Sequence, residues 1–233
     1  MSFALMIPAA GQGERMGKSV KKQYINLKGS PLVTRTLNSF AGCAELFDQV
    51  ILLIPENDHN YVREKVLSGV AKKIRDKIEL IAGGDSRRET VKKGLDSLNS
   101  SSDYVIIHDG ARPFIDCKLV KRIIEEVKKS GAVSVGTPVK DTIKVKNEAG
   151  LVERTLDRDK LIAIQTPQAF SCEIIKKAHG EIKSEEKAPD DACLVEKMGH
   201  KVAIIRGDYD NIKITTPFDL KIAEFLLETR EAN

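Results

Sequence analysis

The chain has 233 residues, of which 31% are charged and 41% hydrophobic, and its formal net charge is +4 at pH 7. Its length suits one sizeable α/β domain or two small ones, and its composition is that of a soluble globular protein. So small a net charge gives no support to nucleic acid as a partner, and no apolar stretch approaches the length of a membrane span.

Cysteine usage and the N-terminal segment bear on the compartment. Four scattered cysteines, at positions 43, 117, 172 and 193, form neither a Cys-x-x-Cys pair nor a Cys/His cluster. The sequence therefore predicts no zinc site and no disulfide framework. The N-terminus lacks a basic segment followed by a long apolar core, so no signal peptide is expected. A reducing cytoplasm is the expected location.

A loop of small residues follows the first predicted strand, Phe3–Ile7. Small side chains let backbone N–H groups approach an anion, and Arg15 and Lys22 add positive charge nearby. The stretch predicts a polyphosphate-binding loop at the carboxyl end of the strand; an ordinary tight turn with basic surface residues is the alternative. Its small residues and its proline are Pro8, Ala9, Ala10, Gly11 and Gly13.

Two familiar phosphate motifs almost fit this loop. The dinucleotide pattern G-x-G-x-x-G would need glycine in place of Met16. The P-loop pattern would need glycine in place of Gln12, although Gly17-Lys18-Ser19 would end it correctly. Neither motif is therefore present.

Strand and helix signals alternate along the rest of the chain, which predicts an α/β fold with a doubly wound, mostly parallel sheet. Ser30 is expected to cap the first helix, with Pro31 at its first position. We find no internal repeat and no flexible linker, so residues 1–233 are interpreted as one domain. The predicted strands are 50–54, 78–81, 104–107, 132–137 and 201–206, the predicted helices are 32–40, 61–70, 116–129, 171–178 and 189–199, a further helix follows Pro217, residues 161–168 return to the core, and 180–188 form a charged loop.

Gly83-Gly84 precede a predicted helix start. Ser86 and Glu89 have the spacing of a capping box, so a helix should begin there. Glycines ahead of a helix N-terminus suggest a ligand-binding loop, and a plain strand-to-helix turn is the alternative.

Asp109 follows the strand 104–107 directly. The carboxyl ends of parallel strands are where α/β folds place their ligands, and one or two carboxylates together with substrate phosphates suit Mg²⁺. Asp109 is therefore a candidate magnesium ligand; helix capping or a pair with Arg112 is the alternative. His108 is interpreted as structural, because no residue near it in sequence offers a partner.

The alternation of strand and helix signals is interrupted at residues 139–156. Apolar and polar residues alternate on both sides of a turn at Asn147–Gly150, which predicts a β-hairpin. A hairpin cannot bury both of its faces within one subunit, so an arm at about 139–157 is expected to make an oligomer contact.

Several sequence blocks, in this order and spacing, resemble the 2-C-methyl-D-erythritol 4-phosphate cytidylyltransferases, a branch of the sugar-phosphate nucleotidyltransferases. Three positions depart from the usual pattern: Lys21 and Pro189 stand where proline and threonine are common, and Gly110 stands where alanine is common. The resemblance covers nearly the whole chain. Its blocks are Pro8–Met16, Lys22–Tyr24, Gly83–Val91, His108–Pro113, Pro138–Thr142, Thr155–Arg158, Thr166–Gln168 and Asn211–Thr215.

The resemblance implies a Rossmann-like nucleotidyltransferase fold and a reaction. CMP would pass from CTP to 2-C-methyl-D-erythritol 4-phosphate, giving 4-diphosphocytidyl-2-C-methyl-D-erythritol and pyrophosphate, with Mg²⁺ held by Asp109. A homodimer would form through the arm and place Arg158 in the partner's site. The implied catalytic residues are Arg15, Lys22, Arg158 and Lys213; the nucleotide contacts are Pro8, Ala9, Ala10, Gly11, Gly13, Gly84, Asp85, Arg87, Thr90, Asp109 and Ala111; the acceptor contacts are Asp109, Arg112, Thr142, Arg158, Thr166 and Lys213.

Two other functions stay open on the sequence alone. A ribitol 5-phosphate cytidylyltransferase would differ in its acceptor. A non-catalytic nucleotide-binding module on the same fold would not need Arg15, Lys22 and Asp109 together.

Overall fold

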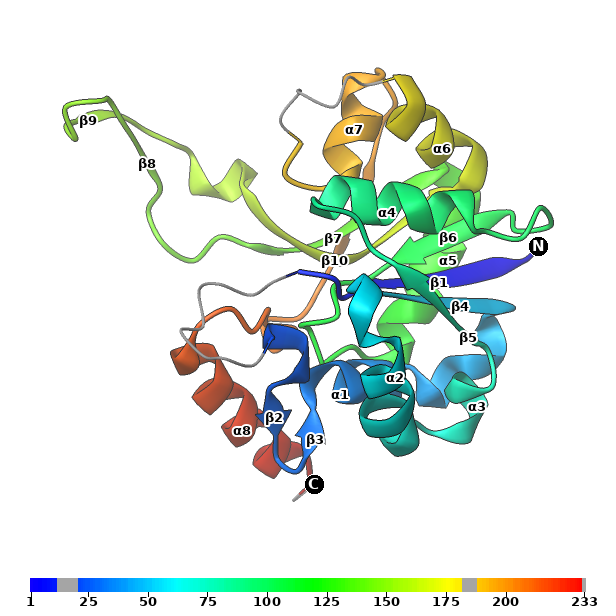
Figure 1. Cartoon of the computed structure of the whole chain (residues 1–233). Coiled ribbons are helices and arrows are strands. Elements are labelled where there is room, and N and C mark those ends of the chain that lie inside the picture. Colours follow the sequence, from blue (N-terminus) through cyan, green and yellow to red (C-terminus); the bar gives the residue numbers. More distant parts are fainter. Residues whose placement is uncertain (12–20, 182–187, 232–233) are drawn as a thin grey trace.

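The structure is a computed structural model, and it describes residues 1–11, 21–181 and 188–231. The strands of its main sheet are β1 (Phe3–Pro8), β4 (Gln49–Ile54), β5 (Ile78–Ala82), β6 (Tyr104–Ile107), β7 (Ala132–Pro138), β10 (Ile162–Ser171) and β11 (Ala203–Arg206). Within the described ranges these seven strands lie in the order β11-β7-β10-β6-β1-β4-β5. β10 runs antiparallel to both neighbours, and the other pairs are parallel. The predicted doubly wound, mostly parallel sheet is confirmed (Figure 1).

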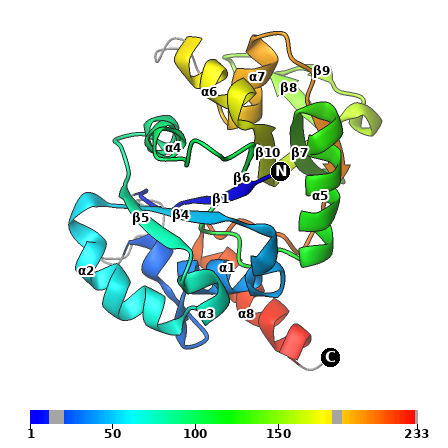
Figure 2. The same cartoon turned by 90° about the vertical axis from the view of Figure 1, so that its right-hand side faces the viewer.

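Helices cover both faces of this sheet, because the central strands are apolar on both sides. The helices are α1 (Leu32–Ser39), α2 (His59–Tyr61), α3 (Lys72–Arg75), α4 (Arg87–Asp96), α5 (Cys117–Ser130), α6 (Cys172–Glu181), α7 (Asp191–Lys197) and α8 (Pro217–Glu231). Apolar residues of α1, α3 and α5 pack on one face, and those of α4, α6 and α7 pack on the other (Figure 2).

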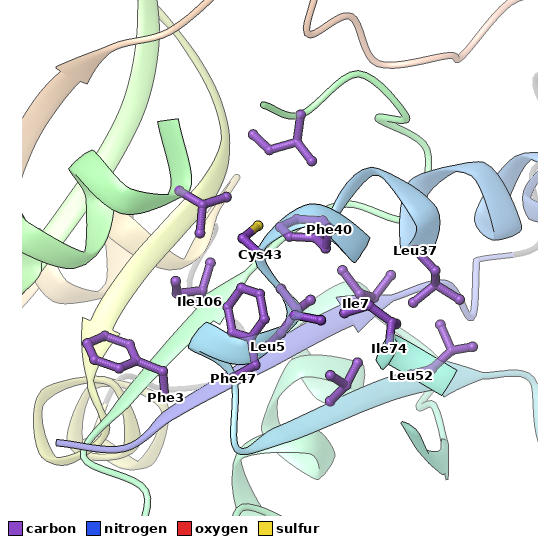
Figure 3. Packing of buried hydrophobic residues seen from close by; sticks show 14 of the residues in the cluster. Phe3, Leu5, Ile7, Leu37, Phe40, Cys43, Phe47, Leu52, Ile74 and Ile106 are labelled. Atoms are coloured by element: carbon purple, nitrogen blue, oxygen red, sulfur yellow. The ribbon is translucent and has the colours of Figure 1, made fainter. Parts of the chain in front are cut away.

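The core follows the alternation of side chains along β1. Leu5 and Ile7 point into the cluster that contains Phe40 and Phe47, as Figure 3 shows. Met6 points to the opposite face and packs beneath α4. The buried sheet thereby fixes where β1 ends and where the following loop begins.

Two local predictions were wrong. Ser30 and Pro31 form a short strand, β3 (Ser30–Pro31), that pairs with β2 (Asn26–Leu27). Pro31 is therefore the N-cap of α1 and Ser30 is not, since Ser30 pairs with Leu27 across the tight turn. The helix expected at 61–70 begins at His59 and contains a π-helical turn over Val62–Val66. The first difference arises because the Asn26–Pro31 segment closes into a tight two-stranded turn, which competes with a helix cap at Ser30.

The predicted hairpin is confirmed and forms an arm. β8 (Lys144–Lys146) and β9 (Val152–Thr155) pair antiparallel, and the arm projects away from the body (Figure 1). Leu151 and Val152 near its tip are exposed. Its strands are shorter than the alternating pattern suggested, and all of their residues except Val145 are exposed.

Candidate active site

A cleft of about 1070 Å³ opens beyond the carboxyl ends of β1, β4, β5 and β6. The predicted site residues that line it are Pro8, Ala9, Ala10, Gly11, Lys22, Gly84, Asp85, Arg87, Thr90, Asp109, Ala111 and Lys213. Gly13 and Arg15 lie outside the described residues. Residues separated by more than 200 positions thus meet in one cleft, because parallel strands end at the same edge of the sheet.

The loop after β1 lies close to the loop after β5. The Ala9 N–H donates to the Leu53 carbonyl over 2.8 Å, which joins the loop to β4. A Cβ at Gly83 would lie 2.2 Å from the Cβ of Ala10, so only glycine allows this approach. The small residues therefore have a packing reason in addition to the clearance that a phosphate needs.

The N-terminus of α4 has the predicted cap. Ser86 Oγ accepts the Glu89 N–H over 3.1 Å, while Glu89 Oε2 accepts the N–H of Asp85. Thr90 Oγ1 accepts the Gly84 N–H over 3.0 Å. These bonds shape the glycine loop, and Thr90 lines the cleft with its hydroxyl engaged in this way.

Asp109 lies among three cationic side chains. Its carboxylate is 2.8 Å from Lys213 Nζ, 3.7 Å from Arg87 Nε and 3.7 Å from Arg112 Nε. Burial acts to raise the pKa of Asp109, but the three cations, Lys213 above all, hold that pKa well below its usual value. One carboxylate among three cations leaves an excess of positive charge, which suits a phosphate-bearing ligand.

Arg87 is held by a second carboxylate that the sequence analysis did not assign to the site. Its NH2 group lies 2.8 Å from Asp191, which is 1% exposed. His179 Nε2 lies 3.1 Å from the other oxygen of Asp191. Despite burial, Arg87 and His179 lower the pKa of Asp191. The sequence signal for this second carboxylate was the Asp190-Asp191 pair. Because Asp190 alone caps α7, the cap gives no reason for Asp191.

Lys213 comes from a loop fixed at both ends. The Asn211 amide donates to the Thr166 carbonyl over 2.8 Å, and the Ile214 N–H donates to the Ala111 carbonyl over 2.9 Å. Asn211 is 1% exposed. It belongs to a block that carried the resemblance, but the sequence offered no role for it.

Arg112 and Thr166, which were expected to contact the acceptor, lie behind Asp109 and do not line the cleft. Thr166 Oγ1 accepts the Asp109 N–H over 3.0 Å, and Arg112 donates to the Asn211 carbonyl. The premise that no residue near His108 in sequence offers it a partner was wrong, because its Nε2 lies 2.9 Å from the Arg112 carbonyl oxygen.

Lys21, which departs from the usual pattern, forms an ion pair with Asp58. Its Nζ lies 2.7 Å from both carboxylate oxygens of Asp58, and the Tyr24 hydroxyl donates to the same carboxylate. These contacts attach the segment that carries Lys22 to the residues just before α2.

Thr142 and Arg158 lie on the arm and are exposed. Arg158 donates to the Lys140 carbonyl over 3.2 Å. The arm extends away from the body in Figure 1, and neither residue lines the cleft of its own chain.

We expect His108 to make the folded protein sensitive to acid. Its ring is fully buried against Phe40, Thr166 and the 109–112 loop, and this burial lowers its pKa from 6.5 to about 4. Below pH 6.5 the imidazole of His108 should therefore be protonated in the unfolded chain, whereas in the folded chain it becomes protonated only near pH 4. The free energy of unfolding should fall by about 3 kcal/mol over that interval. Denaturant titrations in EDTA should show this slope, and an equal slope in His108→Gln would contradict it.

The described ranges contain no group of three or more His, Cys, Asp or Glu side chains arranged to hold a metal ion. Within the same ranges, none of the helices has the length and apolarity needed to cross a bilayer.

Comparisons with known proteins agree with one another. The family model of the 2-C-methyl-D-erythritol 4-phosphate cytidylyltransferases matches residues 3–229. A protein of that name from Clostridium beijerinckii is 44% identical over 224 residues, covering 96% of this chain and 97% of the relative. One from Bacillus velezensis is 40% identical and covers 100% and 99%. The solved 4-diphosphocytidyl-2C-methyl-D-erythritol synthase of Anaerococcus prevotii has a TM-score of 0.84 at 31% identity, covering 97% and 98%.

Proposed function

This chain belongs to the 2-C-methyl-D-erythritol 4-phosphate cytidylyltransferase family, and we propose that the cleft described above is where it transfers CMP. The protein is a nucleotidyltransferase of isoprenoid precursor synthesis, with CTP and 2-C-methyl-D-erythritol 4-phosphate as substrates. The observation that carries the assignment of the site is the contact of Asp109 with Lys213 and Arg87, beside a loop open to phosphates.

The reaction needs little covalent chemistry from the protein. An oxygen of the acceptor phosphate attacks the α-phosphorus of CTP, and the bond from that phosphorus to the β-phosphate oxygen breaks as pyrophosphate leaves. The attacking oxygen is already ionised, so no general base is required. The protein's task is to align the two phosphates and to stabilise the negative charge between them.

The cleft residues divide between the two substrates. Residues 9–11 and Lys22 line the cleft and would bind the CTP phosphates, the former through their backbone, and Arg15 is assigned to the same phosphates by the resemblance. Lys213 would bind the attacking phosphate. The glycine loop at 83–84 and Thr90 would hold the nucleoside.

We also propose that Mg²⁺ assists the transfer. Asp109 is the one buried carboxylate among the described cleft residues, since Glu56 and Asp85 are exposed. Its Oδ1 faces Arg87 Nε at 3.7 Å, beyond hydrogen-bond distance, so this oxygen can ligate a metal. A single carboxylate supplemented by phosphate oxygens and water fits Mg²⁺. When bound, the ion would neutralise charge on the CTP phosphates.

Chelation tests the metal assignment. Activity should vanish in EDTA and return with Mg²⁺, and Asp109→Asn should raise the half-saturating Mg²⁺ concentration at least about tenfold. Pyrophosphate release measured across a Mg²⁺ series reports both effects. Full activity in chelator would remove the metal from the mechanism. An unchanged Mg²⁺ response in Asp109→Asn would keep the metal and discard this ligand.

A turnover assay with both acceptors tests the substrate. CTP should react with 2-C-methyl-D-erythritol 4-phosphate and release pyrophosphate. Faster turnover with ribitol 5-phosphate would favour the alternative acceptor, and CTP binding without pyrophosphate release would indicate a non-catalytic module. We expect a cytoplasmic enzyme, because both substrates carry charges that prevent unaided passage through a bilayer.

A homodimer is part of the proposal. Arg158 and Thr142 lie on an arm that does not reach the cleft of its own chain, and the apolar tip at Leu151 and Val152 is exposed. A two-fold arrangement would let each arm pack on the partner and place Arg158 in the other site.

A further inference from the structure

Four buried residues behind Asp109 are joined in a closed circle of hydrogen bonds. His108 Nε2 lies 2.9 Å from the carbonyl oxygen of Arg112, whose guanidinium donates to the Asn211 carbonyl over 2.7 Å. The Asn211 amide donates to the Thr166 carbonyl over 2.8 Å, and the Thr166 hydroxyl lies 3.2 Å from His108 Nδ1. All four residues are at most 9% exposed. We call these four residues the buried ring.

The acceptors fix the direction of donation around the buried ring. The Arg112 carbonyl can only accept, so Nε2 of His108 must carry a proton. Complete burial of the imidazole favours its neutral form, which leaves Nδ1 as an acceptor for the Thr166 hydroxyl. Each member therefore donates to the next, and the four bonds tie the segments that carry these residues to one another.

The buried ring connects two residues of the cleft. Thr166 Oγ1 accepts the backbone N–H of Asp109, which fixes the carboxylate at the end of β6. Asn211 lies two residues before Lys213, whose Nζ is 2.8 Å from the Asp109 carboxylate. The segment after β6, strand β10 and the 211–213 loop are thus held together at one point.

We propose that His108 is a positioning residue for the transfer: with one nitrogen donating and the other accepting, it closes the buried ring and so sets the relative positions of Asp109 and Lys213. It exchanges no proton with either substrate. This role rests on the proposed function, because Asp109 and Lys213 matter only if they hold the metal and the attacking phosphate.

Which nitrogen of His108 carries the proton tests the buried ring without any substrate. In protein labelled with ¹⁵N-histidine, long-range ¹H–¹⁵N spectra at neutral pH should show His108 protonated at Nε2 and unprotonated at Nδ1. The resonances are assigned by their loss in His108→Gln. Thr166→Val, which removes the hydroxyl, should shift the Nδ1 resonance. A proton on Nδ1, or an Nδ1 resonance that Thr166→Val leaves in place, would overturn the proposal whatever the enzyme's substrate.

Kinetics test whether the buried ring serves the reaction. His108→Phe fills similar space beside Phe40 but removes both hydrogen bonds that His108 makes in the buried ring. The value of kcat per mole of folded protein should therefore fall about 10²-fold. His108→Gln offers a donor and an acceptor of similar reach and should recover most of that loss. Exposed His200→Phe is the matched control and should turn over normally.

The outcomes separate the buried ring from the proposed function. A merely structural His108 would reduce the amount of folded protein and leave kcat per folded molecule unchanged, which would contradict the proposal. A His108→Gln variant as slow as His108→Phe would also contradict it. If His108→Phe fails to fold, Thr166→Val takes its place in the kinetic assay, because it opens the buried ring at the hydroxyl: kcat per folded molecule should fall, and an unchanged kcat would contradict the proposal. Wild-type protein that releases no pyrophosphate would overturn the proposed function, whereas the spectra would still report on the ring.

Discussion

Lys22→Ala is expected to lower kcat about 10²- to 10³-fold while weakening CTP binding far less. The reason is that charge accumulates on the α-phosphate as the acceptor attacks, so a cation beside it contributes more in the transition state than in the bound substrate. Lys22 lines the cleft next to the loop after β1. Arg15→Ala should behave alike, because the resemblance assigns Arg15 to the same phosphates. Pyrophosphate release under single-turnover conditions measures kcat, and equilibrium titration with CTP measures binding.

A matched variant guards against a general effect of lost charge. Lys92 on α4 is exposed and does not line the cleft, so Lys92→Ala should turn over as the unaltered protein does. Near-normal kcat in Lys22→Ala or Arg15→Ala would remove that residue from the catalytic role. A large loss of CTP affinity with unchanged kcat would instead assign it to ground-state binding.

Mixing Arg158→Ala with Lys22→Ala should restore activity that neither variant has alone. If Arg158 acts across the dimer, each heterodimer contains one site with both residues and one site with neither. Random pairing makes about half of the dimers mixed, so about a quarter of all sites should recover. The motivation is geometric: Arg158 lies on the arm, and the cleft of its own chain lacks it.

The mixing experiment needs proof of exchange. The two variants carry different affinity tags and are refolded together, and heterodimers are isolated through both tags. Each variant refolded with itself is the control and should remain nearly inactive. If Arg158 acts within its own chain, isolated heterodimers will be as inactive as the two parents, and the in-trans arrangement will be discarded.

Sequence patterns over a few residues predicted the elements whose formation depends on residues close together in the chain. The strand at 3–7 and the loop after it follow from an apolar run that ends at Pro8. The cap at Ser86 follows from the spacing to Glu89, and the hairpin follows from alternation on both sides of a turn. Such features depend on residues within a few positions of one another, so a single sequence contains them. Ser30 shows the limit, because its pairing with Leu27 displaced a plausible cap.

By itself, then, the sequence determined a mostly parallel α/β sheet, an arm, a loop of small residues after the first strand and an acidic residue at a strand end. Only the tertiary structure decided which charges meet there. Lys213 and Arg87 reach Asp109 from segments 104 and 22 residues away, and Asp191 holds Arg87 from the other side. The tertiary structure also directs Arg112 and Thr166 inward, where they form the buried ring with His108 and Asn211. The physical reason is that strand order and helix packing set these distances, and a buried polar group takes whichever partner the fold brings within reach.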